Sequence, residues 1–496
     1  AVRVGGVFYT ARMTAPVSPA PVAGQKLPTE KVVPLMVALL VAVFAFQLNA
    51  SMLAPALATM EVELNATTAQ IGMTQTAFFT AAALFSLFMP RWGDLIGRRK
   101  VLVGMMVVTV IGSIVAALAT NVTMLFIGRV IQGVSGPTVA LTSVMLRQAV
   151  REEKQFALLV GILTSINGGI AGIDALLGGW LTAAFGFRSL FWVIGAAALI
   201  AVFAVRFGVE ETKSDQLQPM DWKGVIFLVI AVGAILTALN EAGLLAAANW
   251  FLVIVLLVIG AVALVVFWRA EKSSPHPLMS TDLLAQRRTW GLLLTTTLTM
   301  TGVFAVMNGL VPNLAQDPAA GPGMGAGVVS WWTLTPYALA GLAMGPVSGW
   351  LAGRVGYKLI LQIGIGGAAL AVLFGVLVVG RPTAGMLLVM SLLAGITYAG
   401  MANIMLGSLG VVLAPKSNQG YLPGLNGGAF NLGAGLSFTV VFAVFGATGG
   451  SYRAGMIAGA ILLCCAFASS FLIPKPETIP DTLAAEDLRA RGEIVA

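Results

Sequence analysis

The chain has 496 residues, of which 58% are hydrophobic and only 10% are charged. A soluble domain carries about 25% charged residues, so this composition excludes a water-soluble globular protein and predicts an all-α polytopic membrane protein. The net charge of +8 has the sign that nucleic acid attracts, but the positions of the basic residues, described below, argue against nucleic acid as a partner.

Apolar segments long enough to cross a bilayer follow one another along almost the whole chain. An α-helix needs about 20 residues to span the hydrocarbon core, and about fourteen segments meet that length. In chain order they cover 33–52, 71–89, 101–120, 124–146, 156–182, 190–207, 223–244, 250–268, 290–311, 328–353, 359–379, 386–413, 422–445 and 456–473.

Two charge-rich stretches, 210–221 and 269–288, flank the seventh and eighth segments. These two segments are therefore predicted to be a pair inserted between two six-helix bundles. The predicted organisation is a cytoplasmic N-terminal tail (1–30), an N-terminal six-helix bundle (31–207), a linker with two inserted transmembrane helices (208–288), a C-terminal six-helix bundle (289–474) and a cytoplasmic C-terminal tail (475–496).

The basic residues are concentrated on one side of this predicted topology. With both termini in the cytoplasm, the cytoplasmic tails and loops hold 24 of the 28 Lys and Arg, the outer loops hold three, and Arg129 lies inside a span. Such an excess in cytoplasmic loops directs membrane insertion. We therefore predict a multi-pass plasma-membrane protein with both termini in the cytoplasm, and the net charge is explained as an insertion signal.

The second and third predicted spans are joined by a charged turn, Gly93-Asp94-Leu95-Ile96-Gly97-Arg98-Arg99-Lys100. A similar turn, 349–358, follows the second span of the later half, and this recurrence predicts an internal repeat. Asp94 lies among bases at a membrane edge, where it can accept charge-assisted hydrogen bonds from a neighbouring helix end. The predicted conformational latch consists of Asp94, Gly97, Arg98 and Arg99.

These residues resemble the major facilitator superfamily, and the resemblance covers nearly the whole chain. The family's charged loop after helix two is matched by the latch residues and Lys100, and its helix-four pattern is matched by Arg129, Gln132 and Gly133. Fourteen helices rather than twelve point to the branch that resembles drug:proton antiporters. The resemblance implies export of an organic solute by alternating access, driven by a proton gradient and without a cofactor.

Two positions differ from the pattern of that branch. Asn49 stands where an acid is common in helix one, and 174–179 keeps a terminal Gly-Gly pair but has Asp174 in place of the Gly-Pro kink. A proton symporter or importer of a small organic metabolite is therefore the alternative. A channel or a membrane-embedded enzyme accounts for neither matched turn, and the sequence shows no His, Cys or acid cluster suited to catalysis or metal binding.

Arg129 and Asp174 are the ionisable residues deepest within predicted spans. A charge at the bilayer centre costs about 3 kcal/mol on insertion scales, so such a residue normally faces a cavity or a partner. The two spans run in opposite directions, which places both residues in the outer half at similar depth. We predict that Asp174 binds the coupled proton and that Arg129 and access to water control its charge; a permanent structural ion pair is the alternative.

Other polar side chains within spans are candidates for the wall of a substrate cavity. A lone Asn in a span often bonds only a neighbouring helix, and such a bond is worth about 0.6 kcal/mol on average, so half of the set is expected to serve packing. Few of these side chains are acids, which favours an amphipathic, neutral or weakly charged organic solute. We expect the protein to work as a monomer in the lipid bilayer. The predicted set is Gln47, Asn49, Gln132, Asn308, Tyr398, Asn403, Asn426 and Asn431.

Overall fold

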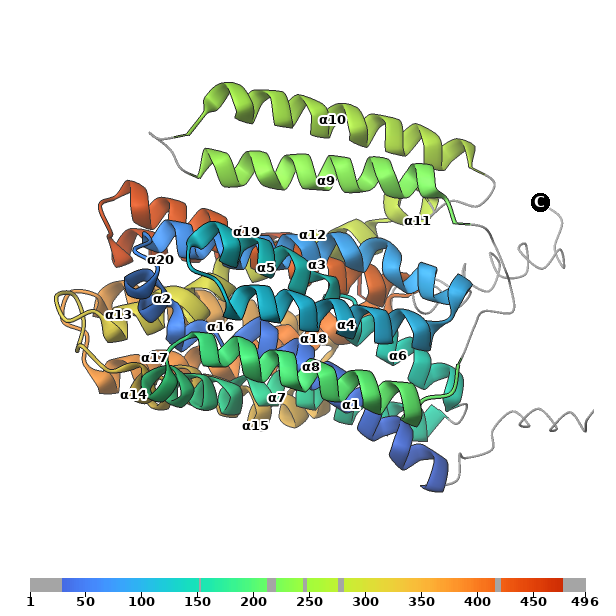
Figure 1. Ribbon diagram of the computed structural model, residues 1–496, viewed down its shortest axis with the longest axis horizontal. Helices are drawn as coiled ribbons and strands as arrows, with labels where there is room; N and C mark the ends of the chain where they lie inside the picture. Colours follow the sequence, from blue (N-terminus) through green and yellow to red (C-terminus); the bar gives the residue numbers. More distant parts are fainter. Residues whose placement is uncertain are drawn as a thin grey trace, which may run out of the picture.

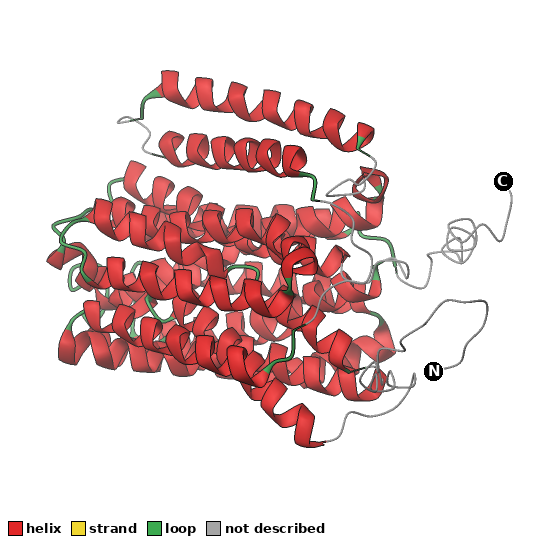
Figure 2. Cartoon of the chain, turned by 45° about the vertical axis from the view of Figure 1, so that its right-hand side comes forward, coloured by secondary structure: helices red, strands yellow, loops and turns green. Residues whose placement is uncertain are grey.

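The computed structural model describes residues 29–150, 153–211, 220–243, 248–274, 281–414 and 421–475. Every regular element within these ranges is helical, as Figure 2 shows. The long helices lie side by side, with their axes close to horizontal in Figure 1. Helices suit a membrane because each one satisfies its backbone hydrogen bonds internally. The prediction of an all-α polytopic membrane protein is confirmed.

In the N-terminal half, several spans are built from consecutive shorter helices. The first span is α1, η1 and α2 in succession, and the fourth is α5, η2 and α6. Two starts are capped in the way their sequences dictate, by a Thr67–Gln70 capping box before α3 and by the Asn121 side chain before α5. The elements are α1 Thr29–Ser51, η1 Ala54–Ala56, α2 Leu57–Glu63, α3 Thr68–Ile96, α4 Arg98–Ala117, α5 Val122–Gln132, η2 Gly133–Ser135, α6 Thr138–Ala149, α7 Glu153–Phe185 and α8 Arg188–Gly208.

The C-terminal half repeats this plan with two irregular stretches of its own. Its first and fourth spans each contain a π-helical segment, η4 and η5. The elements are α11 Thr281–Ala285, α12 Arg287–Ala305, η4 Val306–Leu310, α13 Val311–Gln316, α14 Ala326–Trp332, α15 Leu334–Val355, α16 Tyr357–Val378, α17 Ala384–Ala394, η5 Gly395–Ala402, α18 Asn403–Val412, α19 Tyr421–Ala447 and α20 Tyr452–Ser470.

The two inserted helices, α9 (Trp222–Ala242) and α10 (Trp250–Ser273), form a hairpin outside the main bundle, at the top of Figure 1. α9 packs on α3 of the first half and on α19 of the second. α10 packs on α9 and exposes large apolar side chains such as Phe251 and Ile254, which suits contact with lipid. The hairpin therefore covers a junction between the halves. The exact domain boundaries stay a prediction.

Twelve helices in the described ranges are long and apolar enough to cross a membrane. The predicted count of about fourteen is not confirmed. The two predicted spans outside the twelve, 156–182 and 328–353, correspond to α7 and α15, which are helices of 33 and 22 residues. The second of these spans is divided at Thr333, whose backbone leaves the helical region and separates α14 from α15.

The charged turn after the second span recurs in the second half with the same backbone. Gly97 (φ +119°) and Gly356 (φ +92°) both adopt positive φ values that side-chain-bearing residues rarely take. Each glycine N–H also donates to the carbonyl four residues earlier, at 2.9 Å in both turns. The internal repeat is thus present in the geometry.

The two halves meet along two seams. On the first, α3 lies against α19, and the hydroxyls of Thr76 and Thr439 are 3.2 Å apart. On the second, α7 lies against α14 and α15, where the hydroxyls of Ser330 and Thr335 each donate to a backbone carbonyl of α7 at 2.8 Å. α3 and α7 are therefore the long helices of the first half that lie against the second half along these seams.

Candidate functional site

Arg129 of α5 is completely buried and is held by uncharged groups. Its Nη1 donates to the side chain and backbone oxygens of Asn49 and to Gln132 Oε1 (2.9 Å), and its Nη2 donates to Gln75 Oε1 (3.0 Å). Its guanidinium carbon lies 4.1 Å from the centre of the Phe78 ring. A buried charge needs such partners, and here amide dipoles and an aromatic face supply them.

Asp174 of α7 is also buried, with 1% of its surface exposed. The hydroxyl of Ser51, the last residue of α1, donates to Asp174 Oδ2, while Asp174 Oδ1 has no hydrogen-bond partner within the described residues. Ser51 Oγ is also 3.0 Å from the Gln47 carbonyl and accepts from Gln47 Nε2 at 2.8 Å. A buried acid with one free oxygen and one hydroxyl partner is suited to bind and release a proton.

The direct Arg129–Asp174 pair that the sequence allowed is not formed. Within the described residues, each of the two bonds instead to the last turn of α1: Arg129 to Asn49, and Asp174 to Ser51, two residues further on. The last turn of α1 thus connects the buried base to the buried acid. Sequence reasoning placed both residues at depth, and it missed Ser51 and Gln75 because a single polar residue in a span gives no indication of its partner.

The Gly-Gly pair after Asp174 allows α7 to fit between the halves. A Cβ at Gly178 would lie 2.3 Å from the Met52 carbonyl oxygen, and one at Gly179 would lie 2.4 Å from the Ala326 carbonyl oxygen. The first contact is with the N-terminal half and the second with the C-terminal half. Side chains at these positions would push α7 away from both neighbours.

The residues of the predicted latch form a network at the C-terminal end of α3. Arg98 is almost fully buried, and its guanidinium lies 2.5 Å from Asp94 Oδ1. Arg99 donates its backbone N–H to Glu211 (3.1 Å) and its guanidinium to the Val209 carbonyl (3.1 Å), beyond the end of α8. Asp94, on α3, accepts from Arg98 at the start of α4, which is the neighbouring helix end that the sequence predicted. Glu211, which was not predicted, joins the same turn to the segment beyond α8.

The π-helical segments hold two of the predicted cavity residues, and π-helical turns are frequent at functional sites. Asn308 lies in η4 and donates to the Phe304 carbonyl at 3.1 Å. Tyr398 lies in η5, where its ring stacks on Tyr337 with centroids 6.3 Å apart, and its hydroxyl donates to Met300 Sδ at 2.7 Å. The sequence indicated these residues but not their π-helical backbone.

The other predicted cavity residues lie in several different surroundings. Asn426 is used within the C-terminal half, where it accepts from Thr296 (2.6 Å) and donates to the Leu406 carbonyl (3.1 Å), so it serves packing. Asn431 donates across the α3–α19 seam to Ser86 at 3.3 Å. Asn403 is half-buried at the start of α18. Gln47, Asn49 and Gln132 belong to the network around Arg129 and Ser51, together with Ser113, which accepts from Gln132 at 2.8 Å.

An aromatic cluster in the seam between the halves was not predicted. The ring centroid of Phe79 on α3 lies 5.1 Å from that of Phe304 on α12 and 6.4 Å from that of Phe438 on α19. Phenylalanines in spans are too common for their sequence positions to single out such a cluster. It offers flat apolar surfaces from both halves at one place.

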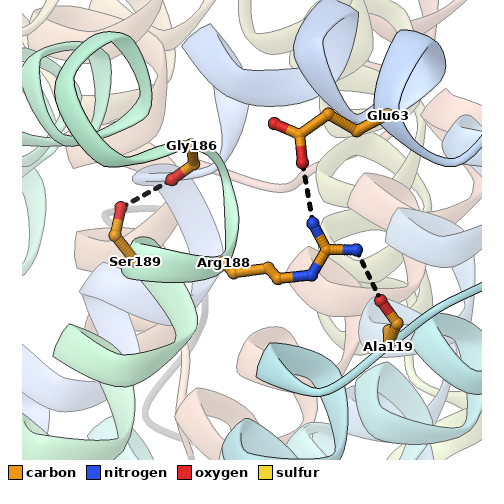
Figure 3. A network of polar contacts seen from close by, with 5 residues as sticks. All are labelled: Glu63, Ala119, Gly186, Arg188 and Ser189. Carbon is orange, nitrogen blue, oxygen red and sulfur yellow. Dashed lines mark hydrogen bonds and ion pairs between the residues drawn. The ribbon is translucent and has the colours of Figure 1, made fainter.

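A second charged network lies at the opposite end of the N-terminal half, where α2 ends and α8 begins. Figure 3 shows Arg188, the first residue of α8, between Glu63 and Ala119. Its guanidinium lies 2.7 Å from the Glu63 carboxylate and donates to the Ala119 carbonyl at 2.9 Å. The end of α2, the segment just after α4 and the start of α8 are thereby joined.

The family model described as Major Facilitator Superfamily matches residues 39–221, 221–438 and 292–492. The chain belongs to the Major Facilitator Superfamily. This major facilitator is a secondary transporter and not an enzyme, and the resemblance that the charged turn and the helix-four pattern indicated is confirmed for the superfamily. Membership of the fourteen-helix drug:proton antiporter branch is not confirmed.

Three known transporters are similar to this major facilitator in sequence or in structure. It is 53% identical over 454 residues to the uridine/deoxyuridine transporter of Lactococcus lactis subsp. cremoris (strain MG1363), across 89% of this chain and 95% of that one. It is 28% identical over 372 residues to the multidrug resistance protein Stp of Mycobacterium tuberculosis (strain CDC 1551 / Oshkosh), across 74% and 67%. The crystal structure of the human organic anion transporter MFSD10 (TETRAN) matches with a TM-score of 0.61 and 14% identity, across 90% of this chain and all of that one, which supports the fold alone.

Proposed function

We propose that this transporter carries pyrimidine nucleosides, of the uridine and deoxyuridine type, into the cell together with protons. The observation that carries the proposal is the 53% identity to a uridine/deoxyuridine transporter across 89% of the chain. A fold alone does not define a substrate, whereas identity at this level extends through both halves. The proposal takes the uptake alternative of the sequence analysis in preference to drug export.

The chemistry of the candidate cavity agrees with a neutral nucleoside. A pyrimidine base presents a flat face that aromatic side chains can stack on, and its edge and ribose hydroxyls suit amide and phenol groups. The Phe79–Phe304–Phe438 cluster and the side chains of Asn308 and Tyr398 supply these two kinds of surface. We propose that the solute binds between the halves near these residues.

Transport would proceed by alternating separation of the halves. The ends that we assign to the outer side are in contact in this conformation, since Asn313 on α13 donates to Glu61 on α2 at 3.4 Å and Ser330 on α14 donates to the Ala175 carbonyl of α7 at 2.8 Å. We infer that these contacts close the outer side and must break before a solute enters from outside. The Asp94–Arg98–Arg99 network at the inner end would be rearranged in the same movement.

We assign proton binding to Asp174, with Arg129 as the fixed positive charge connected to it through α1. A neutral carboxyl can stay buried at little cost, whereas a carboxylate favours access to water, so protonation would bias the packing of α7 on α1. We expect the protein to work as a monomer in the plasma membrane, with both termini in the cytoplasm.

Drug export is the second candidate, because the chain is 28% identical to the multidrug resistance protein Stp across 74% of its length. The two functions predict opposite proton movements. A symporter takes up solute and protons together, whereas an antiporter releases protons from everted vesicles when drug is added.

The deciding experiment measures labelled uridine in proteoliposomes with an imposed pH gradient. We expect uridine to accumulate on the alkaline side and to move protons with it, and Asp174→Asn to lose accumulation while keeping uridine–uridine exchange. Proton movement caused by cationic drugs, with no response to uridine, would establish export instead. Wild-type accumulation by Asp174→Asn would remove that residue from the coupling mechanism.

A further inference from the structure

The last turn of α1 holds a hydroxyl that faces three polar atoms at once. Ser51 Oγ contacts Asp174 Oδ2, lies 3.0 Å from the Gln47 carbonyl oxygen and accepts from Gln47 Nε2 at 2.8 Å. A serine hydroxyl has one proton to donate and two lone pairs. It can therefore donate to the carboxylate or to the carbonyl, but not fully to both.

We propose that Ser51 is a positioning residue: its hydrogen bonds change when Asp174 gains or loses a proton. This change alters the last turn of α1 and, through that turn, the contacts of Arg129. The proposal rests on the proton-binding role assigned to Asp174 above. When Asp174 is charged, Ser51 donates to it. When a proton binds and an O–H bond forms on the carboxyl, Asp174 becomes the donor, Ser51 accepts from it, and the Ser51 proton turns to the Gln47 carbonyl.

This exchange of hydrogen bonds acts on the end of a helix. A serine hydroxyl that bonds the carbonyl four residues earlier competes with the backbone and bends a helix. Ser51 is the final residue of α1, and Asn49, which binds Arg129 through both its side chain and its backbone carbonyl, lies in the same turn. A change at Ser51 therefore reaches Arg129 through two residues of main chain.

No other ionisable group bonds Asp174 within the described residues, so Ser51 is its only side-chain hydrogen-bond partner there. Of the elements that pack against α7, η1 and α14 contain no ionisable side chain. The others carry ionisable side chains in their first or last turns, except for Tyr337 near the start of α15. These residues are Glu30 and Lys31 on α1, Arg147 on α6, Arg188 and Arg206 on α8, and Tyr337 and Arg354 on α15.

The test uses purified protein and pH-difference infrared spectroscopy, which needs no substrate. We expect a carboxyl C=O band in the wild type that is absent in Asp174→Asn. In Ser51→Ala the band should move to the higher frequency of a carboxyl without a hydrogen-bond partner, and Ser51→Thr, which keeps the hydroxyl, should restore it. Ser135→Ala is the matched control, because Ser135 is buried and, among the described residues, its hydroxyl bonds only the Gln132 carbonyl (2.8 Å), so the band should not move.

Transport gives the second measurement. Ser51→Ala should lower uridine accumulation driven by a pH gradient by about tenfold, as expected when a hydrogen bond to a charged group is lost. Uridine–uridine exchange, which needs no net proton movement, should stay within about twofold.

An unshifted Asp174 band in Ser51→Ala would overturn the inference and leave the proposed function standing. Absence of any band that depends on Asp174 would overturn both the inference and the coupling role of Asp174. A shifted band in a protein that does not move uridine would support the inference and reject the proposed substrate.

Discussion

The charged turns of the two halves share a backbone and differ in their charges. After each positive-φ glycine, Gly97 or Gly356, the second residue is basic and caps the end of the last helix of its own half. Arg99 donates to the Val209 carbonyl (3.1 Å) beyond α8, and Lys358 donates to the carbonyls of Phe471 (3.0 Å) and Ile473 (2.6 Å) beyond α20. The glycine and the basic cap are therefore the common requirement of this turn.

Among the described residues, acids bond the basic residues of this turn only in the N-terminal half. Asp94 lies three residues before Gly97, whereas Gly353 lies three residues before Gly356. Asp94 holds the buried Arg98, and Glu211 binds Arg99 from beyond α8. The turn itself therefore needs no acid, and the acids of the first half are available for a conformational role.

The largest effect is expected from adding a methyl group at the first glycine. Gly97→Ala must accept φ near +119°, and its Cβ would lie 2.6 Å from a Glu211 carboxylate oxygen. Strain of this kind costs about 1–3 kcal/mol, and displacing Glu211 adds to it. Thermal unfolding in detergent should show a lower midpoint than for Gly356→Ala, which carries the backbone strain at φ +92°. Gly104→Ala, with no atom near its Cβ, is the control. Equal losses at Gly97 and Gly356 would mean that Glu211 adds nothing.

Removing the acid beyond α8 should have the next largest effect. Glu211→Ala takes away the acceptor of the Arg99 N–H and an oxygen 3.7 Å from its guanidinium. Both side chains are about a fifth exposed (24% and 21%), so screening limits the expected loss of unfolding free energy to about 1 kcal/mol. Glu210→Ala changes an exposed neighbouring acid and should cost nothing measurable. A similar loss in both variants would contradict a specific role for Glu211.

Removing the charge of Asp94 should change transport more than stability. Asp94→Asn leaves the nearly buried Arg98 without its anionic partner, and Asp94 is 37% exposed, so the loss should be about 1 kcal/mol or less. If the proposed function holds, we expect the uridine transport rate to fall several-fold, because the predicted latch would have to form again in each cycle. The reciprocal change, Gly353→Asp, has open space around its Cβ and should leave the rate unchanged. An unaltered rate in Asp94→Asn would rule out the latch.

The smallest effect is expected at the cap of the C-terminal half. Lys358→Ala removes two hydrogen bonds to carbonyls beyond α20, and a cation at a helix C-terminus contributes about 0.3–1 kcal/mol. The unfolding midpoint should fall slightly, and Lys358→Arg should restore it. A larger loss than for Glu211→Ala would show that the C-terminal turn depends more on its cap than the first turn does.

Much of the fold could be predicted because the local amino-acid composition identifies membrane spans. The apolar lengths and the bias of Lys and Arg gave the helical class, and the glycine-containing turns gave the repeat. The break at Thr333 and the π-helical segments could not be predicted, because their causes lie in tertiary packing. Residues 151–152 and 415–420, in predicted loops between spans, lie outside the described ranges.

The sequence could predict which site residues lie deep within spans, but it could not predict which residues they contact. Arg129 and Asp174 stood out because ionisable residues within spans are rare. Their partners are ordinary polar residues at distances along the chain that no motif records: Asn49 is 80 residues from Arg129, and Ser51 is 123 residues from Asp174. Glu211 is 112 residues from Arg99 and lies in what reads as a charged linker.

The surroundings of Arg129 have a consequence for leakage of ions. Its partners within the described residues are neutral, so its positive charge is solvated and not cancelled. A fixed charge in a region of effective dielectric about 20 repels a monovalent cation by about 4 kcal/mol at 4 Å. On the solute path that we propose between the halves, we therefore expect sodium and potassium ions to be disfavoured near Arg129, whereas an uncharged molecule meets no such barrier.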